Sequence, residues 1–107
     1  MPITIKSLAT GQLAAAKATI YTCPALTTAI VRLIKFVNTG AAARTLNLYI
    51  KESGGSSRRI WPVALSLPSG YEATESGVIT LSAGDELEAD ASVANEVDFS
   101  ISGVERT

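Results

Sequence analysis

The residues best spaced for chemistry are three carboxylates in the segment ELEADASV, residues 86–93. Glu86, Glu88 and Asp90 alternate with apolar residues, so a strand would place them on one face, about 7 Å apart per step. Paired carboxylates can hydrolyse glycosides, and carboxylate oxygens are the ligands that calcium prefers. An acid catalyst, however, needs a partly desolvated carboxyl group, and a strand that turns this face to water provides the opposite. We therefore expect a solvated acidic face, with a cation at a subunit contact as the alternative.

The residues that other kinds of catalysis need are missing from the sequence. The sequence contains no histidine, so a serine or cysteine nucleophile lacks its usual general base and a zinc site lacks its imidazole ligands. Cys23 is the only cysteine, which excludes an internal disulfide. Its position between Thr22 and Pro24 favours a small buried residue over a reactive thiol. We predict that the protein is not an enzyme and has no catalytic residues, no cofactor and no metal.

Two arginines beside a tryptophan form the pattern most typical of an interaction site. Arg58, Arg59 and Trp61 are residue types enriched at binding hot spots. Pro62 follows the tryptophan and indicates an edge strand, because proline cannot donate to a central ladder. We predict an interface at Arg58, Arg59 and Trp61; the alternative is a core tryptophan beside two solvated arginines.

A second predicted contact lies at the start of the chain. Residues 1–12 are read as an arm that contacts a neighbouring subunit through Ile3 and Ile5. The segment lacks the apolar stretch of a secretory signal, so we expect synthesis in a cytoplasm. No apolar run is long enough to span a bilayer, because Arg32 and Lys35 interrupt the best candidate.

The elements that position these residues are strands. The 107 residues suit one domain, and turn-forming residues separate short runs of alternating apolar and polar residues. We predict a single-domain, all-β, antiparallel β-sandwich, jelly-roll-like, over residues 1–107. About eight strands are expected, near residues 3–7, 17–22, 28–38, 44–51, 58–65, 76–81, 86–93 and 96–104. Residues 11–18 are expected to form at most one short helical turn.

One predicted strand, residues 29–38, is apolar on both faces. Such a strand is usually buried on both sides, here by the opposite sheet and by another subunit or chain segment. The alternative is a β-bulge that re-aims half of the strand.

Charge is divided unevenly along the chain. Residues 1–53 contain six basic residues and one acidic residue, whereas residues 54–107 contain three basic and nine acidic residues. The two halves can interleave as strands and neutralise each other, or neighbouring copies can meet with opposite faces. The net charge of −1 and the acidic second half argue against binding to nucleic acid.

Several segments together resemble small virion proteins of tailed bacteriophages. They are LATGQL, ATIYTCPALTTAIVRLIKFVNTGAAARTLNLYIK, GVITLSAGDELEADAS and VDFSISGVE, which cover nearly the whole chain. The chain departs from this pattern at Cys23, where valine or a small residue is usual, and at Leu26, where glycine is usual.

The resemblance implies a non-enzymatic β-sandwich that is present in a virion in many copies. We expect a capsid cement or decoration protein that stabilises the shell through subunit contacts. It would be made in the bacterial host cytoplasm, would form a homo-oligomer, preferably a trimer, and would contact the major capsid protein or other virion proteins. One alternative is a structural protein of the neck, tail or baseplate. Another is a carbohydrate- or receptor-binding module that uses Tyr21, Tyr49, Trp61 and Tyr71.

Overall fold

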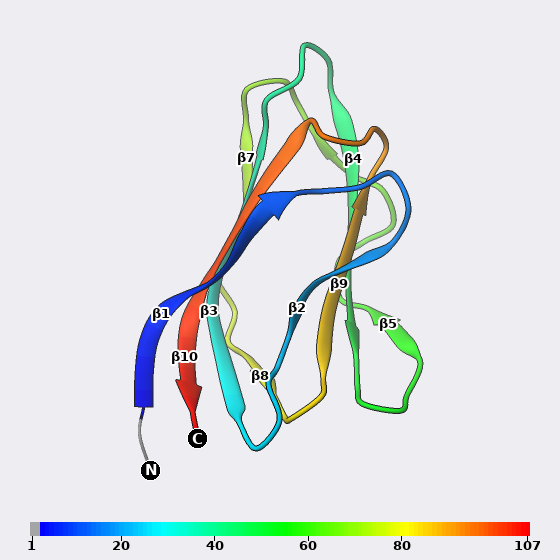
Figure 1. Cartoon of the computed structure of the whole chain (residues 1–107). Coiled ribbons are helices and arrows are strands. Elements are labelled where there is room, and N and C mark those ends of the chain that lie inside the picture. The colour runs from blue at the N-terminus through cyan, green and yellow to red at the C-terminus, as the bar shows by residue number, and fades with distance from the viewer. Residues whose placement is uncertain (1–2) are drawn as a thin grey trace.

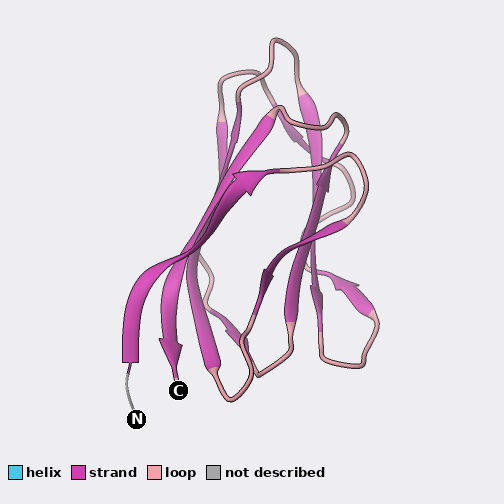
Figure 2. Ribbon diagram, viewed as in Figure 1, coloured by secondary structure: helices cyan, strands magenta, loops and turns pink. Residues whose placement is uncertain are grey.

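The computed structural model describes residues 3–107, with side chains from Ser7 onward, and these residues form strands and loops without a helix (Figure 2). Accordingly, no described segment is a helix that could span a membrane. The ten strands are β1 (Ile3–Gln12), β2 (Ala18–Thr22), β3 (Thr28–Asn38), β4 (Arg44–Lys51), β5 (Ser57–Arg59), β6 (Leu65–Leu67), β7 (Glu72–Glu75), β8 (Ile79–Leu81), β9 (Glu86–Ala91) and β10 (Val97–Arg106).

The strands form two sheets that pack face to face (Figure 1). The first sheet has the order β1-β10-β3, with β7 and β8 both paired to the far edge of β3; the second has the order β2-β9-β4, with β5 and β6 both paired to β4. Every pairing is antiparallel. Each strand of the first half thus pairs with one from the second half in reverse order, as in a long hairpin rolled into two sheets. This nesting is the jelly-roll arrangement, and the predicted antiparallel sandwich is confirmed.

The same nesting explains the uneven charge. Strands of the basic first half lie beside strands of the acidic second half throughout both sheets. Lys35 Nζ on β3 lies 3.1 Å from Glu72 Oε2 on β7, and Lys51 on β4 is paired with Glu86 on β9. The interleaving alternative is therefore correct, and the charges of the two halves neutralise each other within one chain.

The core lies between the sheets and follows the alternation in the sequence. Along β9 and β10 every second residue is buried: Leu87, Ala89, Ala91, Val97, Phe99 and Ile101. On β4 Leu46 and Leu48 are buried, but the alternation fails toward its end, where Ile50 is only half-buried and Tyr49 on the opposite face is buried. The strand expected over residues 86–93 would have turned Val93 inward; it ends at Ala91, and Val93 lies exposed in the loop that follows.

A β-bulge explains why β3 is apolar on both faces. Leu33 pairs with Ser102 and Val31 pairs with Gly103, which leaves Arg32 as an extra residue. Ala29 and Val31 are buried before the bulge, and Ile34 and Phe36 are buried after it, so the inward face changes phase at this point. The bulge alternative is correct. Burial of the outer face of β3 by another subunit remains a prediction.

The predicted strand at residues 58–65 is interrupted. The chain leaves β4 after Arg59 and returns to it at Leu65, because Pro62 lacks an N–H group and Ala64 has a left-handed φ of 52°. The segment predicted at 76–81 is strand only from Ile79, and β7 was missed. Residues 13–17 form a bend rather than a helical turn.

Candidate interaction surfaces

One end of the sandwich carries four loops of small residues (Figure 1). We call residues 13–17, 39–43, 68–71 and 92–96 the loop platform. Its exposed surface consists mainly of alanine, glycine and serine, with one prominent aromatic ring, Tyr71, whose side chain is 65% exposed. Lys17 and Glu96 are the charged residues within these loops. Neither charge is free on the platform, since Lys17 Nζ lies over the Tyr49 ring and Glu96 pairs with Arg44.

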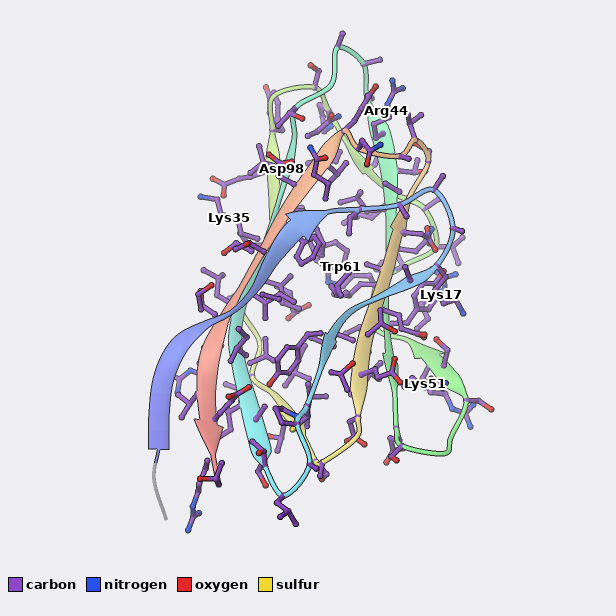
Figure 3. The ribbon with its side chains drawn as sticks, in the orientation of Figure 1. Lys17, Lys35, Arg44, Lys51, Trp61 and Asp98 are labelled. Carbon is purple, nitrogen blue, oxygen red and sulfur yellow. The ribbon has the colours of Figure 1, made fainter. Side chains whose placement is uncertain are left out.

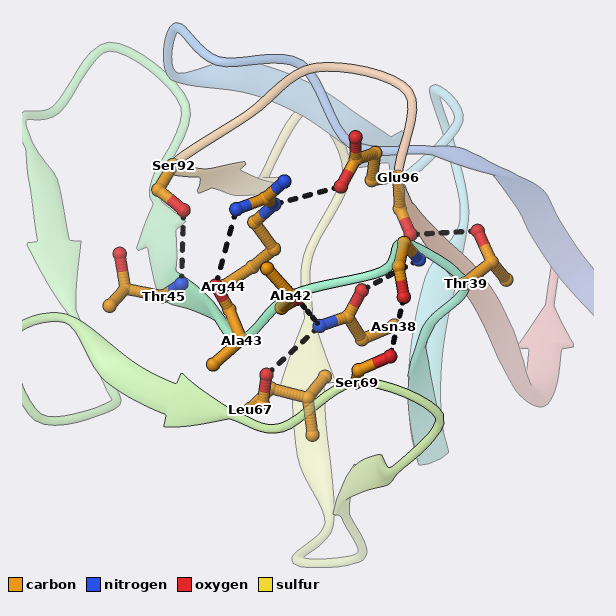
Figure 4. A network of polar contacts seen from close by, with 11 residues as sticks. Asn38, Thr39, Ala42, Ala43, Arg44, Thr45, Leu67, Ser69, Ser92 and Glu96 are labelled. Atoms are coloured by element: carbon orange, nitrogen blue, oxygen red, sulfur yellow. Dashed lines mark hydrogen bonds and ion pairs between the residues drawn. The ribbon is translucent and has the colours of Figure 1, made fainter.

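Asn38, at the end of β3, holds two of these loops together (Figure 4). Its side chain is fully buried, and Nδ2 donates to the carbonyl oxygens of Ala42 at 2.9 Å and Leu67 at 3.0 Å. Its Oδ1 accepts a hydrogen bond from the Gly40 N–H. Asn38 therefore satisfies three backbone groups of the chain around it, of which the Leu67 carbonyl lies in the buried part of the site.

The other two loops are tied to this pair. Arg44 Nε donates to Glu96 Oε1 at 2.8 Å, and the Glu96 carbonyl accepts from Thr39 (Figure 4). Asn95 N–H donates to the Leu13 carbonyl, which joins the first loop to the last. All four loops are thus fixed by hydrogen bonds between them.

The platform suits binding rather than catalysis. Alanine, glycine and proline lose almost no rotamer freedom when a surface is buried, and a loop that is already ordered costs little to order further. A surface with few charges also needs little desolvation of ions. In the sequence this surface is visible only as the runs AAA at 14–16 and GAAA at 40–43.

The acidic face of β9 has partners rather than being simply solvated. Thr19 donates to Glu86, and Asp90 accepts from Asn47 Nδ2 at 2.7 Å and from the Tyr49 hydroxyl at 3.1 Å. One oxygen of Glu88 is buried without a hydrogen-bond partner. The predicted solvated face is therefore wrong in part.

Two cationic side chains lie against the ring of Tyr49, on the face of the sheet that carries the acidic residues of β9. Lys17 Nζ lies 4.3 Å and Arg59 Cζ 4.9 Å from the centre of the Tyr49 ring. These contacts are worth about 1 kcal/mol each in partly exposed settings. Among residues 3–107, no group of three His, Cys, Asp or Glu side chains is arranged to hold a metal.

The predicted interface residues Arg58, Arg59 and Trp61 do not share one exposed surface. Arg58 and Arg59 are exposed on β5, the edge strand beside β4, where an interface remains a prediction. Trp61 is only 8% exposed and lies between the sheets (Figure 3). Its ring contacts Phe36 edge-to-face at 5.2 Å between centres, and Nε1 donates to Glu75 at 2.8 Å. The surroundings of Trp61 are thus those of a core tryptophan, as in the alternative interpretation of this segment.

The proposed N-terminal arm is part of a sheet. Its backbone from Ile3 to Gln12 is the edge strand β1, in which Ile3 is paired with Arg106 and Ile5 with Val104. The side chains of Ile3 and Ile5 lie outside the described residues, as do residues 1 and 2 altogether. Contact between this strand and a neighbouring subunit remains a prediction.

The end of the sandwich opposite the platform carries an exposed leucine that was not among the predicted site residues. Leu26, in the loop between β2 and β3, has a left-handed φ of 57° and a side chain that is 92% exposed. The conformation suits glycine, the residue that the phage resemblance expects here. In the sequence, the sign that position 26 is unusual was this departure from the phage pattern.

Comparison with known proteins supports the fold. No family model matches the chain, and no curated protein is similar to it. A chain from Bacillus endospore appendages, described as a family of disulfide-linked pili, has a TM-score of 0.59 and 17% identity, over 98% of this chain and 88% of that one. A chain from the acid-stable capsid of Helicobacter pylori bacteriophage KHP30 has a TM-score of 0.55 and 12% identity, over 96% and 86% of the respective chains. At these identities the similarity concerns the β-sandwich fold.

A buried phenol near the Leu26 end makes stability depend on pH. The Tyr21 hydroxyl donates to Glu105 Oε2 at 2.6 Å, and burial together with this carboxylate raises the pKa of Tyr21 above its ordinary value of 10.0. Burial also raises the pKa of the Cys23 thiol. The unfolded chain therefore loses these protons first, so the free energy of unfolding should fall as pH rises through the ordinary tyrosine range.

Replacement of Tyr21 by Phe tests whether the Tyr21 hydroxyl causes this pH dependence of stability. At pH 7 we expect Tyr21→Phe to lower the free energy of unfolding by about 1–2 kcal/mol, because the hydrogen bond to a carboxylate is lost. Above pH 10 the difference from the native chain should shrink, as measured by urea unfolding at several pH values. A difference that is constant with pH would show that the Tyr21 hydroxyl does not titrate with unfolding.

Proposed function

We propose that the protein is a structural subunit of a bacteriophage virion, bound to the capsid as a cement or decoration protein. The observation that carries the proposal is the loop platform, an ordered and nearly uncharged surface that four loops build at one end of a jelly roll. Such a surface can dock on a shell at small entropic cost, and many copies multiply a modest contact into substantial stabilisation. Its partner in this proposal is the major capsid protein.

The resemblance to tailed-phage virion proteins supports the same role. It also supports a homo-oligomer, preferably a trimer, that is made in the host cytoplasm and incorporated into the virion. A structural place in the neck, tail or baseplate is the second candidate, because the same platform could dock on any of these assemblies.

The aromatic side chains argue against a glycan-binding module. Of the four rings proposed for such a site, Tyr21, Tyr49 and Trp61 are buried, and only Tyr71 is exposed. A sugar-binding platform needs accessible ring faces, and these three faces are covered by the core or by cations. Glu86 and Asp90 on β9 are hydrogen-bonded to neighbouring side chains, which also gives no support for a glycosidase that uses this pair of carboxylates.

A charge placed on the platform tests the proposal. Val93 is partly exposed in the loop between β9 and β10, so Val93→Lys should leave the fold intact and bring an unpaired cation into the contact. We expect at least a tenfold loss of binding to capsids assembled without the protein, because an unpaired charge buried in an interface costs well over 1.4 kcal/mol. Co-sedimentation measures the bound fraction.

The matched control is Ser56→Lys, which adds the same charge to the exposed loop between β4 and β5, at the opposite end. This variant should bind as the native protein does. Equal binding of all three proteins would remove the platform from the contact. Binding to purified tails in place of capsids would favour the second candidate.

A further inference from the structure

Tyr71 is the prominent aromatic residue of the loop platform. It is 65% exposed, while the exposed surface around it consists mainly of alanine, glycine and serine. The other two tyrosines of the chain, Tyr21 and Tyr49, are buried. A single exposed ring is common on protein surfaces, so its meaning depends on how the structure holds it.

The backbone beneath the ring is fixed. Residues 68–71 form a tight turn, in which the Tyr71 N–H donates to the Pro68 carbonyl at 3.1 Å and Gly70 has a left-handed φ of 76°. This hydrogen bond and a glycine in the third position are typical of a type II turn. Asn38 holds the turn from the side, since its N–H donates to the Tyr71 carbonyl at 3.0 Å and its carbonyl accepts from the Gly70 N–H at 2.9 Å. Both backbone groups of Tyr71 are thus hydrogen-bonded, and the ring projects from a rigid base.

The hydroxyl group of Tyr71 is available to another molecule. The hydroxyls of Tyr21 and Tyr49 donate to Glu105 and Asp90, whereas that of Tyr71 has no hydrogen-bond partner among the described residues. It can therefore donate to an acceptor outside the chain without breaking a bond within it. A fixed backbone, an exposed ring and a free hydroxyl together make a preorganised binding residue.

We propose that Tyr71 is the anchor of the contact between the platform and the capsid. Its ring enters an apolar pocket on the major capsid protein, and its hydroxyl donates to an acceptor in that pocket. The inference rests on the proposed function, and it names the residue that carries the contact and the kind of surface that receives it.

The composition of the platform suits such an anchor. Binding hot spots are often single aromatic residues, surrounded by contacts that add little energy but exclude water. The small residues at 14–16 and 40–43 provide such surroundings, because they have no long side chains that would hold a partner away from the ring. Tyrosine loses the freedom of only two side-chain torsions when it is buried. Val93, the other large apolar residue exposed on the platform, is smaller and only 37% exposed.

Binding of variants to capsids assembled without the protein tests the anchor. Tyr71→Ala should bind at least about 30-fold more weakly, the loss expected of a hot-spot residue. Tyr71→Phe should bind about threefold to tenfold more weakly, because only the donated hydrogen bond is lost. The unfolding midpoints of both variants should equal that of the native chain, since the ring is exposed and the backbone hydrogen bonds remain. The control Val63→Ala shortens a residue outside the platform that is 72% exposed, and it should bind as the native protein does.

Nitration of tyrosine by tetranitromethane gives a second measurement, on the native chain. In the free protein Tyr71 should react before Tyr21 and Tyr49, because the other two rings are buried. In the capsid-bound protein the nitration of Tyr71 should be lost, because the partner encloses its ring. Mass spectrometry of the digested protein distinguishes the three sites.

The results separate this inference from the proposed function. A native protein that does not bind capsids would overturn both. If the native protein binds and Val93→Lys does not, but Tyr71→Ala binds as the native chain does, the platform contact stands and the anchor is wrong. Continued nitration of Tyr71 in the bound protein would also overturn the anchor, as would equal losses of binding for Tyr71→Ala and Val63→Ala.

Discussion

Replacement of Gly103 by Ala is expected to destabilise the protein by about 3 kcal/mol or more, the range of severe overpacking in a core. Gly103 lies on the central strand β10, opposite the bulge in β3. A Cβ atom at this position would overlap the carbonyl oxygen of Ile30 and lie 3.1 Å from Val31 Cα. Both neighbours are backbone in the middle of the first sheet, so the clash can be relieved only by a shift of β3 away from β10. Urea unfolding followed by circular dichroism measures the loss.

The control for this prediction is Gly55→Ala in the exposed loop between β4 and β5. The nearest atom to a Cβ there is the Glu52 carbonyl oxygen at 3.3 Å, in a loop that can adjust. This variant should change the free energy of unfolding by less than about 1 kcal/mol, as usual for a surface change. If Gly103→Ala were equally mild, the close approach of β3 and β10 at the bulge would be incorrect.

Strands with one buried face were predictable from the sequence. In β4 and β9 each apolar residue alternates with a polar one, and the bounds of β4 agree with the prediction because the alternation alone decides which face is buried. The jelly-roll nesting also agrees with the division of charge, since basic and acidic halves that pair strand by strand leave few like charges side by side.

Features that depend on contacts between distant segments could not be predicted from the alternation of apolar and polar residues. The bulge at Arg32 arises from the register with β10, about seventy residues later, and its sequence trace, two apolar faces, is also what a fully buried strand would show. The interruption after Arg59 likewise depends on where β4 offers backbone groups to the returning chain. Local propensity contains neither piece of information.

The candidate surfaces were harder to predict than the fold. Arg58, Arg59 and Trp61 were selected by residue type, but the fold separates them, because Trp61 turns into the core and the arginines stay on the edge strand. The loop platform consists mainly of small residues, whose runs at 14–16 and 40–43 bring no functional group. It becomes a surface only when four loops far apart in sequence meet at one end of the sandwich.

Replacement of Asn38 by Ala is expected to cost about 3 kcal/mol and to loosen the loop platform. The side chain is fully buried, and its removal leaves the carbonyls of Ala42 and Leu67 and the N–H of Gly40 without partners. The buried Leu67 carbonyl costs about 1–3 kcal/mol when left unsatisfied, and the loss of the two part-buried bonds at Ala42 and Gly40 adds about 1 kcal/mol each. Hydrogen exchange of the Gly40 amide should accelerate more than that of amides in β9.

Two further variants separate the role of Asn38 in holding the loops from its volume. Asn38→Asp keeps the shape and the oxygen that accepts from Gly40, but places a second oxygen against the carbonyls of Ala42 and Leu67, so it should be at least as damaging as alanine. Thr39→Ala removes an exposed hydroxyl that donates to Glu96 and should cost less than about 1 kcal/mol. If Asn38→Asp were as stable as the native chain, the donated hydrogen bonds would not hold the loops. If the Asp variant is no more stable than the Ala variant, and both are less stable than the native chain, one amide group fixes the geometry of the platform. Binding and loop order should then be lost together.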